Sequence, residues 1–158
     1  MIFVTLGSQK FQFNRLLKAV DQLIDEGIVT KDVFAQTGYS DYQPKNFRYQ
    51  PFLDREAFAE KMGQADIVIT HGGTGAIIGA VKKGKKVIAV PRLAKYGEHV
   101  DDHQQQLIGQ FCDLNLICSC DSVEELEVAI SRARESQFAK YVSNTETIIQ
   151  SISRYIEG

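Results

Sequence analysis

The chain alternates short runs of apolar residues with longer stretches in which apolar residues recur every three or four positions. The first pattern is typical of buried strands and the second of amphipathic helices. The pattern predicts six strands, over Ile2–Leu6, Asp32–Gln36, Asn46–Phe52, Ile67–Thr70, Val87–Val90 and Leu114–Cys118. It predicts helices over Phe11–Glu26, Asp54–Met62, Ala76–Lys83, Asp101–Phe111, Val123–Ser136 and Phe138–Ile156.

Strands that alternate with helices favour right-handed crossovers and a mostly parallel sheet. We expect one α/β domain over residues 1–158, because the sequence contains no repeat or linker. Asp54 is expected to cap its helix, and Gly27 and Gly84 to end the helices before them. The one long loop, Thr37–Lys45, is expected to be mobile.

Composition narrows the classes of function. The chain has 158 residues, 44% of them hydrophobic and 24% charged, which is typical of a globular domain. A net charge of -2 argues against a nucleic-acid binder. No apolar run is long enough for a transmembrane helix, and the first residues lack the features of a signal peptide. We therefore expect a cytoplasmic protein with three reduced cysteines and no zinc site, because no second Cys or His pair stands at ligand spacing from Cys118.

Ligands bind such sheets beyond the carboxyl ends of the strands, so the residues after each strand are the informative ones. The sharpest motif is Thr70-His71-Gly72-Gly73-Thr74-Gly75, which connects a strand to a helix. Its glycines leave backbone N–H groups open to an anion at the helix N-terminus. A tight turn without a ligand is the alternative. His71 is a candidate general base, phosphate-side donor or core histidine, and the sequence does not choose among them.

Two further strand ends carry polar candidates. Gly7-Ser8 follows the first strand, where Ser8 either meets a ligand or caps the helix. Residues 98–106 form the densest polar cluster, and its glutamines can hydrogen-bond sugar hydroxyls. His99 and His103 stand four apart, so a metal site is weighed here, although the His-Glu-x-x-His pattern is absent. A solvated helix start is the other alternative.

Two surface features suggest contacts. The lysines between Lys82 and Lys86 suit a solvated helix C-terminus, with a partner protein or anionic lipid as the alternatives. The last predicted helix, about 138–157, carries an amphipathic stripe. It either packs on its own sheet or docks on another subunit, including a second copy of the chain.

In their order and spacing, these residues resemble the C-terminal, donor-binding half of GT-B glycosyltransferases of the glycosyltransferase family 28 type. Relatives of similar length are detached halves: small subunits of split bacterial capsule and exopolysaccharide enzymes, and of the dolichol-linked N-acetylglucosamine transferase. The resemblance is carried by Phe3–Ser8, Ala65–Gly75, Lys85–Pro91 and Asp102–Gln105. Residues 97–104 look most like the bacterial polysaccharide branch. The resemblance implies a Rossmann-like half of a GT-B fold, with helices on both faces of the sheet.

The resemblance also implies a role for each part of the site. Gly72, Gly73, Thr74 and Gly75 would hold the diphosphate of a UDP-sugar, and Gly7 and Ser8 would line the opposite wall of the cleft. The segment at Phe52 and Leu53 would meet the uracil. His103, Gln104 and Gln105 would reach the donor sugar. Apart from the resemblance, we expect His71 to have an electrostatic or catalytic role. No metal or other cofactor is expected.

One position departs from this pattern. Full-length relatives carry an acidic residue eight positions after the residue that matches His71, where it grips the ribose, and this chain has Gly79. Either the ribose is held otherwise, or donor binding and activity are weak until a partner completes the site. The expected function is that of a donor-binding subunit. A membrane-associated partner would supply the acceptor site and the catalytic base for inverting transfer to a lipid-diphosphate-linked sugar. A non-catalytic activator and a stand-alone NAD enzyme of Rossmann type are the alternatives. Galactose, glucuronic acid and N-acetylglucosamine all stay open as the transferred sugar.

Overall fold

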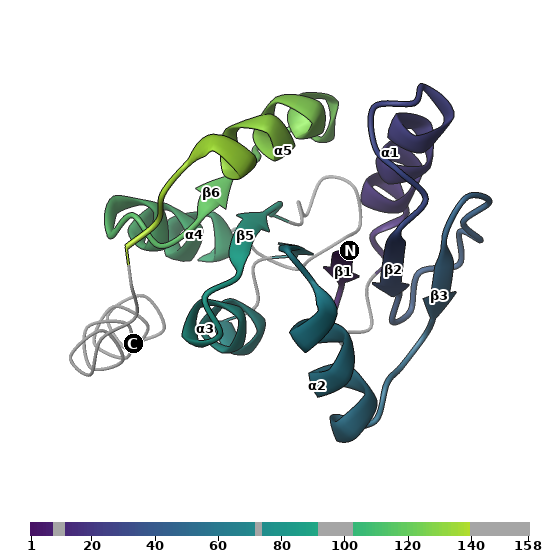
Figure 1. Cartoon of the computed structure of the whole chain (residues 1–158), viewed down its shortest axis with the longest axis horizontal. Helices are drawn as coiled ribbons and strands as arrows, with labels where there is room; N and C mark the ends of the chain where they lie inside the picture. The colour runs from purple at the N-terminus through teal and green to yellow at the C-terminus, as the bar shows by residue number, and fades with distance from the viewer. Residues whose placement is uncertain (8–11, 72–73, 92–102, 140–158) are drawn as a thin grey trace.

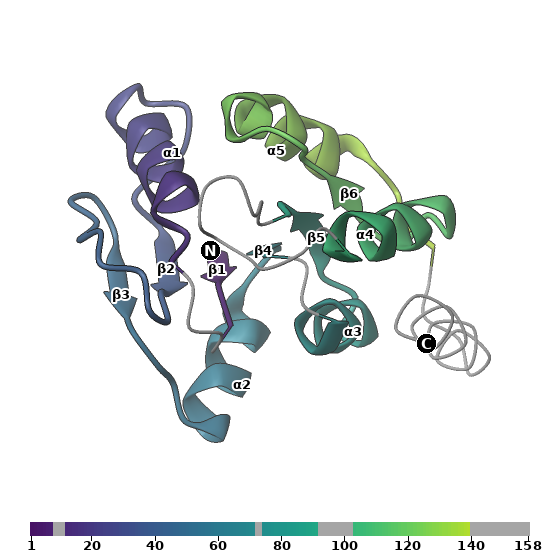
Figure 2. The ribbon, with the colours of Figure 1, turned by 180° about the vertical axis from the view of Figure 1, so that it is seen from behind.

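In the computed structural model, which describes residues 1–7, 12–71, 74–91 and 103–139, the strands form one parallel six-stranded sheet. They are β1 (Ile2–Thr5), β2 (Val33–Gln36), β3 (Arg48–Gln50), β4 (Ile67–Thr70), β5 (Lys86–Ala89) and β6 (Cys118–Ser119). The spatial order is β3-β2-β1-β4-β5-β6, so β3 and β6 form the two margins (Figures 1 and 2). This is the doubly wound order of Rossmann-like sheets, and it confirms the predicted parallel sheet of about six strands.

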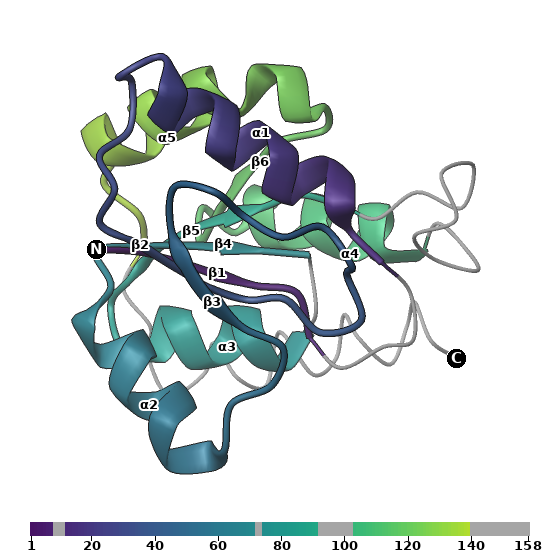
Figure 3. The ribbon, with the colours of Figure 1, turned by 90° about the vertical axis from the view of Figure 1, so that its right-hand side faces the viewer.

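Helices cover both faces of the sheet, as predicted (Figure 3). They are α1 (Asn14–Asp25), α2 (Arg55–Gln64), α3 (Thr74–Lys82), α4 (His103–Asp113) and α5 (Leu126–Glu135), the last preceded by a 3₁₀ turn at Val123–Glu125. The alternation of side chains along each strand divides the core in two. Ile2 and Val4 of β1 pack with α1 and α5, whereas Phe3 faces the helices of the opposite side. Both faces of the central strands are therefore buried, which is why the sequences of these strands are unbroken apolar runs.

Local signals at the helix ends are confirmed. Asp54 precedes α2, and its carboxylate accepts a hydrogen bond from the Ala57 amide at 2.7 Å, as an N-cap does. Gly27 and Gly84 follow α1 and α3 with φ angles of +74° and +72°. Left-handed glycines of this kind end helices.

Two predicted boundaries are wrong. Leu114 lies in the turn that follows α4 rather than in a strand, and in this turn Asn115, with a φ of 56°, closes the C-terminus of the helix. The strand begins only at Cys118. The last helix does not begin at Phe138, because residues 136–139 are irregular and the Ala139 amide donates to the Asn115 carbonyl. The rest of that predicted helix, 140–157, lies outside the described residues.

The long loop 37–45, expected to be mobile, is tied to α1. Asp21 is the anchor: it lies on α1, is 3% exposed, and accepts hydrogen bonds from the loop and the residue after it. The donors are the Tyr42 hydroxyl at 2.6 Å, the Lys45 amide at 2.9 Å and the Asn46 amide at 3.1 Å. A buried carboxylate satisfied in this way holds its donors firmly. These contacts argue against a mobile loop and fix the path of the chain from β2 to β3.

This anchor predicts an alkaline weak point. The hydrogen bond to Asp21 raises the pKa of Tyr42 from 10.0 to about 12. Because the folded state holds the phenolic proton more tightly, this stabilisation is complete below about pH 10 and is lost as the pH rises toward 12. Urea unfolding of the wild type is expected to show a steeper loss of stability above about pH 10 than that of Tyr42→Phe. Equal slopes for the two proteins would contradict the assignment.

Candidate functional site

The sheet order places a topological switch point between β1 and β4. The chain winds outward through β2 and β3 on one side and through β5 and β6 on the other. In parallel α/β sheets, the crevice at the carboxyl ends of the strands flanking this point is the usual ligand site. Thr5 of β1 is paired with Thr70 of β4, so the predicted Gly7 and His71 segments leave the sheet side by side.

Gly7 and His71 are in close contact. Gly7 has a φ of +71°, and a Cβ atom built on it would lie 2.6 Å from His71 Nε2. His71 is only 5% exposed. The imidazole therefore packs against the backbone of the first loop, where only glycine leaves room for it. This contact joins two predicted site segments that are more than sixty residues apart in sequence.

The glycine-rich motif begins a helix as predicted. Helix α3 starts at Thr74, and Gly75 is exposed in its first turn. Thr70, the last residue of β4, is fully buried, and its hydroxyl has no hydrogen-bond partner among the residues that the structure describes. A polar group of this kind next to a helix N-terminus suits a polar ligand or an ordered water. Gly72, Gly73 and Ser8 lie outside the described residues.

Sequence reasoning missed a polar cluster at the end of β2. Gln36 is 5% exposed, and its side-chain amide contacts the turn after β1 and the turn after β3. Gly38, two residues later, has a φ of +58°, and a Cβ on it would lie 2.7 Å from the Gly7 carbonyl oxygen. The only local signal in the sequence is a polar strand end followed by a glycine, which is ordinary for a turn. These contacts follow from the register of β1 and β2, which the sequence alone does not show.

Two exposed aromatic side chains follow the carboxyl ends of β2 and β3. Phe52, predicted to lie at the uracil segment, is 50% exposed, and Leu53 beside it is half-buried against the core. Tyr39, which the sequence analysis did not select, is 51% exposed and meets the Phe52 ring edge-on with 5.4 Å between centroids. Exposed rings at the carboxyl edge offer flat apolar surface to a base.

The predicted sugar-binding residues His103, Gln104 and Gln105 form the first turn of α4, and the structure describes their backbone only. The sequence analysis also missed Arg15 of α1. Its guanidinium donates to the Pro91 carbonyl at 3.5 Å, at the end of β5. A cation is thus present at the edge predicted to receive a diphosphate, which favours an anionic ligand there.

Among the described residues, no group of three His, Cys, Asp or Glu side chains is placed to bind a metal ion. No helix in the same part of the chain is long and apolar enough to span a membrane. The three cysteines are free, and burial raises the pKa of Cys120 to about 11. A thiol with so high a pKa is a poor nucleophile near neutral pH.

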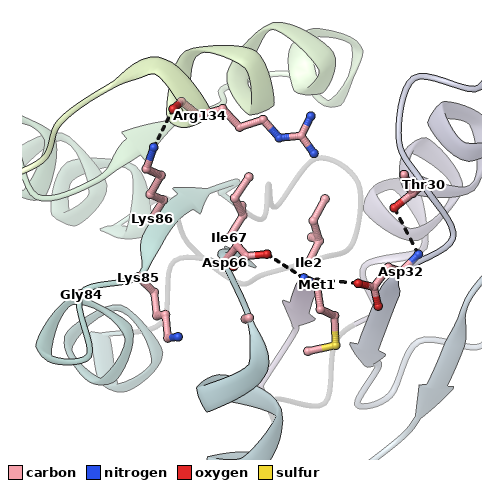
Figure 4. Close-up of a pocket in the computed structure, with 11 residues that line it drawn as sticks. Met1, Ile2, Thr30, Asp32, Asp66, Ile67, Gly84, Lys85, Lys86 and Arg134 are labelled. Carbon is pink, nitrogen blue, oxygen red and sulfur yellow. Dashed lines mark hydrogen bonds and ion pairs between the residues drawn. The ribbon is translucent and has the colours of Figure 1, made fainter.

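A pocket of about 500 Å³ lies at the opposite, amino edge of the sheet (Figure 4). Its polar groups largely satisfy one another. The amino group of Met1 contacts the carboxylates of Asp66 at 2.8 Å and Asp32 at 3.5 Å, and Lys86 donates to the Arg134 carbonyl at 2.6 Å. The Asp66 hydrogen bond raises the pKa of that amino group. Because ligands of such sheets bind at the carboxyl edge, we place the candidate site there and not in this pocket.

Comparison with known proteins agrees with this architecture. A solution structure of ALG13 superposes with a TM-score of 0.65 at 19% identity, covering 99% of this chain and 96% of that one. The calicheamicin glycosyltransferase CalG4 superposes with a TM-score of 0.62, also at 19% identity, covering 99% of this chain and 39% of its own. The fold is therefore that of the C-terminal half of GT-B glycosyltransferases.

Residues 1–156 match the Glycosyltransferase family 28 C-terminal domain, and the chain belongs to this family. A related sequence is the UDP-N-acetylglucosamine transferase subunit ALG13 of Saccharomyces cerevisiae, 32% identical over 76 residues. The match covers 48% of this chain and 36% of the yeast protein, so it spans little more than a third of that relative. These findings confirm the predicted resemblance.

Proposed function

We propose that the chain is the UDP-sugar-binding subunit of a two-component inverting glycosyltransferase. The observation that carries the proposal is the arrangement at the switch point, where Gly7 packs on His71 directly before the N-terminus of α3. That helix end, with its unsatisfied N–H groups, suits a diphosphate. The exposed ring of Phe52 suits a base at the same edge. The family and the printed name of the yeast relative support a UDP-sugar as the donor.

The proposed chemistry divides between two proteins. The acceptor hydroxyl attacks the anomeric carbon, the bond to UDP breaks, and the configuration inverts. On this chain, the N-terminus of α3 stabilises the charge on the departing diphosphate, with no metal expected. His71 contributes electrostatically from its buried position. The base that removes the acceptor proton belongs to the partner.

The partner, the acceptor and the location of the chain belong to the same proposal. The partner is a membrane-associated subunit that binds a lipid-diphosphate-linked sugar, so this chain would lie in the cytoplasm at the membrane face. The pattern of residues 97–104 favours a capsule or exopolysaccharide acceptor. We expect the segment 138–157 to dock on the partner, with self-association as the alternative.

A second function has one observation in its favour. Gly79 stands where full-length relatives of the family are expected to carry the ribose-binding acid. A chain that has lost this contact suits a non-catalytic activator of a partner glycosyltransferase. Nucleotide binding separates the two functions, because only the donor subunit needs it.

The test is thermal unfolding of the purified chain with UDP, with the UDP derivatives of N-acetylglucosamine, galactose and glucuronic acid, and with NAD. A ligand at 100 times its dissociation constant stabilises the folded state by about 2.7 kcal/mol. For a domain of this size we expect a rise in Tm of several degrees with UDP and with one UDP-sugar, and none with NAD. A shift with NAD alone would favour a Rossmann-type oxidoreductase. No shift with any nucleotide would favour either a donor site that the partner completes or the activator, and the same measurement on the complex with the partner separates these two.

A further inference from the structure

The side chain of Gln36 connects two loops of the candidate site. It stands at the end of β2 and is 5% exposed. Its Oε1 accepts hydrogen bonds from the Thr5 hydroxyl at 3.0 Å and the Gly7 amide at 3.1 Å. Its Nε2 donates to the Gly7 carbonyl at 2.9 Å and the Pro51 carbonyl at 2.8 Å. The two donors and two acceptor positions of the amide are all used.

The bonds to Gly7 copy a backbone pairing. The amide of Gln36 exchanges one N–H and one carbonyl contact with Gly7, as the hydrogen-bonded residue pair of an antiparallel ladder does, although β1 and β2 themselves pair in parallel. Pairing between β1 and β2 is thereby extended past Thr5, where the strands end. The partners also fix the orientation of the amide, because a flipped side chain would set Oε1 against two carbonyl oxygens.

The bond to Pro51 matters because β3 is a weak element. It has three residues, all exposed, and lies at the margin of the sheet. The turn after it is held by Gln36 together with the amides of Thr37 and Gly38, which donate to the carbonyls of Gln50 and Pro51. Phe52 and Leu53 follow Pro51 directly. The position of the predicted uracil segment therefore depends on the end of β2.

The same residue controls the other wall of the cleft. Gly7 is bonded by Gln36 on its N–H and on its carbonyl, and it packs on His71. The buried amide thus links the segment expected to hold the base to the cleft wall at Gly7, which packs on His71 beside the loop expected to hold the diphosphate. Nucleotides gain affinity when such segments are already in place before binding, because less ordering is needed on association.

We infer that Gln36 is a positioning residue for nucleotide binding, which fixes the turns after β1 and β3 relative to each other. The inference rests on the proposed function. Gln36 does not itself need to touch the ligand. It acts through Gly7 and Pro51, so its loss weakens binding by a chain that is still folded.

The experiment measures UDP affinity by calorimetry for the full chain and three variants, under conditions where circular dichroism shows each to be folded. Gln36→Leu removes the four bonds, and Gln36→Glu keeps the shape but replaces the donor with an acceptor. Gln43→Glu, at an exposed position of the loop, is the matched control. We expect the dissociation constant for UDP to rise at least about tenfold in both Gln36 variants and to be unchanged in the control.

A pH series adds a second measurement, the UDP affinity of Gln36→Glu as a function of pH, which a purely structural role of Gln36 would not change. In Gln36→Glu, the carboxylate faces the carbonyls of Gly7 and Pro51, but its protonated form can donate to one of them. UDP binding by this variant is expected to recover as the pH falls from about 8 to about 5.5. Wild type and Gln36→Leu contain the same His71 and report any pH dependence that belongs to the histidine. Absence of a recovery specific to Gln36→Glu would overturn the inference.

The remaining outcomes separate the inference from the function. If wild type binds UDP and the Gln36 variants bind it equally well, the inference is wrong and the proposed function stands. If wild type binds no UDP, either alone or in complex with its partner, the proposed function is wrong. In that case hydrogen exchange decides the positioning role: faster exchange of the Gly7 amide in Gln36→Leu than in wild type supports it, and equal exchange overturns it.

Discussion

Replacing Gly38 with alanine is expected to lower the free energy of unfolding by roughly 3 kcal/mol, the largest stability effect of the substitutions considered. Two costs combine. Gly38 has a φ of +58°, which is unfavourable for a residue with a Cβ atom. The new methyl group would also lie 2.7 Å from the Gly7 carbonyl oxygen. Backbone cannot move aside as a flexible side chain can, so relief of this overlap must separate the turns after β1 and β2.

Gly27→Ala is the matched control. Gly27 has a φ of +74°, close to that of Gly38, but nothing lies within 4 Å of its added Cβ. It should therefore show the conformational cost alone, about 1 kcal/mol. Urea unfolding measures both values, and the difference is the cost of the close approach between Gly38 and Gly7. For a domain of this size we expect a Tm lower by roughly 10 °C in Gly38→Ala. Equal effects of the two substitutions would show that the turns are not in contact.

The sequence predicted the central strands β1, β4 and β5 because each of them lies in a short apolar run. Both faces of the central strands are buried, so the runs are uninterrupted and easy to find. The predicted boundaries of strands and helices were wrong where tertiary contacts determine the end of an element. Leu114 and Leu116 suit a strand by composition, yet Asn115 in the left-handed conformation ends α4 between them. Glycine identified the ends of α1 and α3, whereas asparagine takes the left-handed conformation less often and did not identify this one.

The candidate site was predicted only where it is continuous in sequence. The segment from Thr70 to Gly75 was found because its glycines are neighbours and follow a strand. Gln36 was missed because its significance lies in the pairing of β1, β2 and β3, which brings Gly7 and Pro51 within reach of one amide. Which residues face each other across strands is set by the register of the sheet, and a pattern along one chain does not contain it.

Replacing Gly79 with glutamate is expected to raise the affinity for UDP by about tenfold, the largest gain of function expected from a single change. Gly79 lies on α3, one helical turn after the exposed Gly75 and therefore on the same side of the helix. Nothing lies within 4 Å of a Cβ added to Gly79, so the fold has room for a side chain. The resemblance to full-length relatives implies that an acid here grips the ribose, and a carboxylate accepts strong hydrogen bonds from its hydroxyl groups.

Three comparisons separate a ribose contact from simpler causes. Gly79→Ala is expected to stabilise α3 by about 0.5–1 kcal/mol without changing the affinity for UDP, because it improves helix propensity alone. Gly63→Glu adds the same charge on α2, again where the added Cβ is uncrowded, and should leave binding unchanged.

Calorimetry with 2′-deoxy-UDP tests the contact itself, since this nucleotide lacks the 2′-hydroxyl. A gain for UDP that shrinks with the deoxynucleotide would mean that the chain retains the donor site and lacks only this contact. The same gain for both nucleotides would show that the new carboxylate does not hold the ribose, and no gain at all would favour an activator whose donor site is lost.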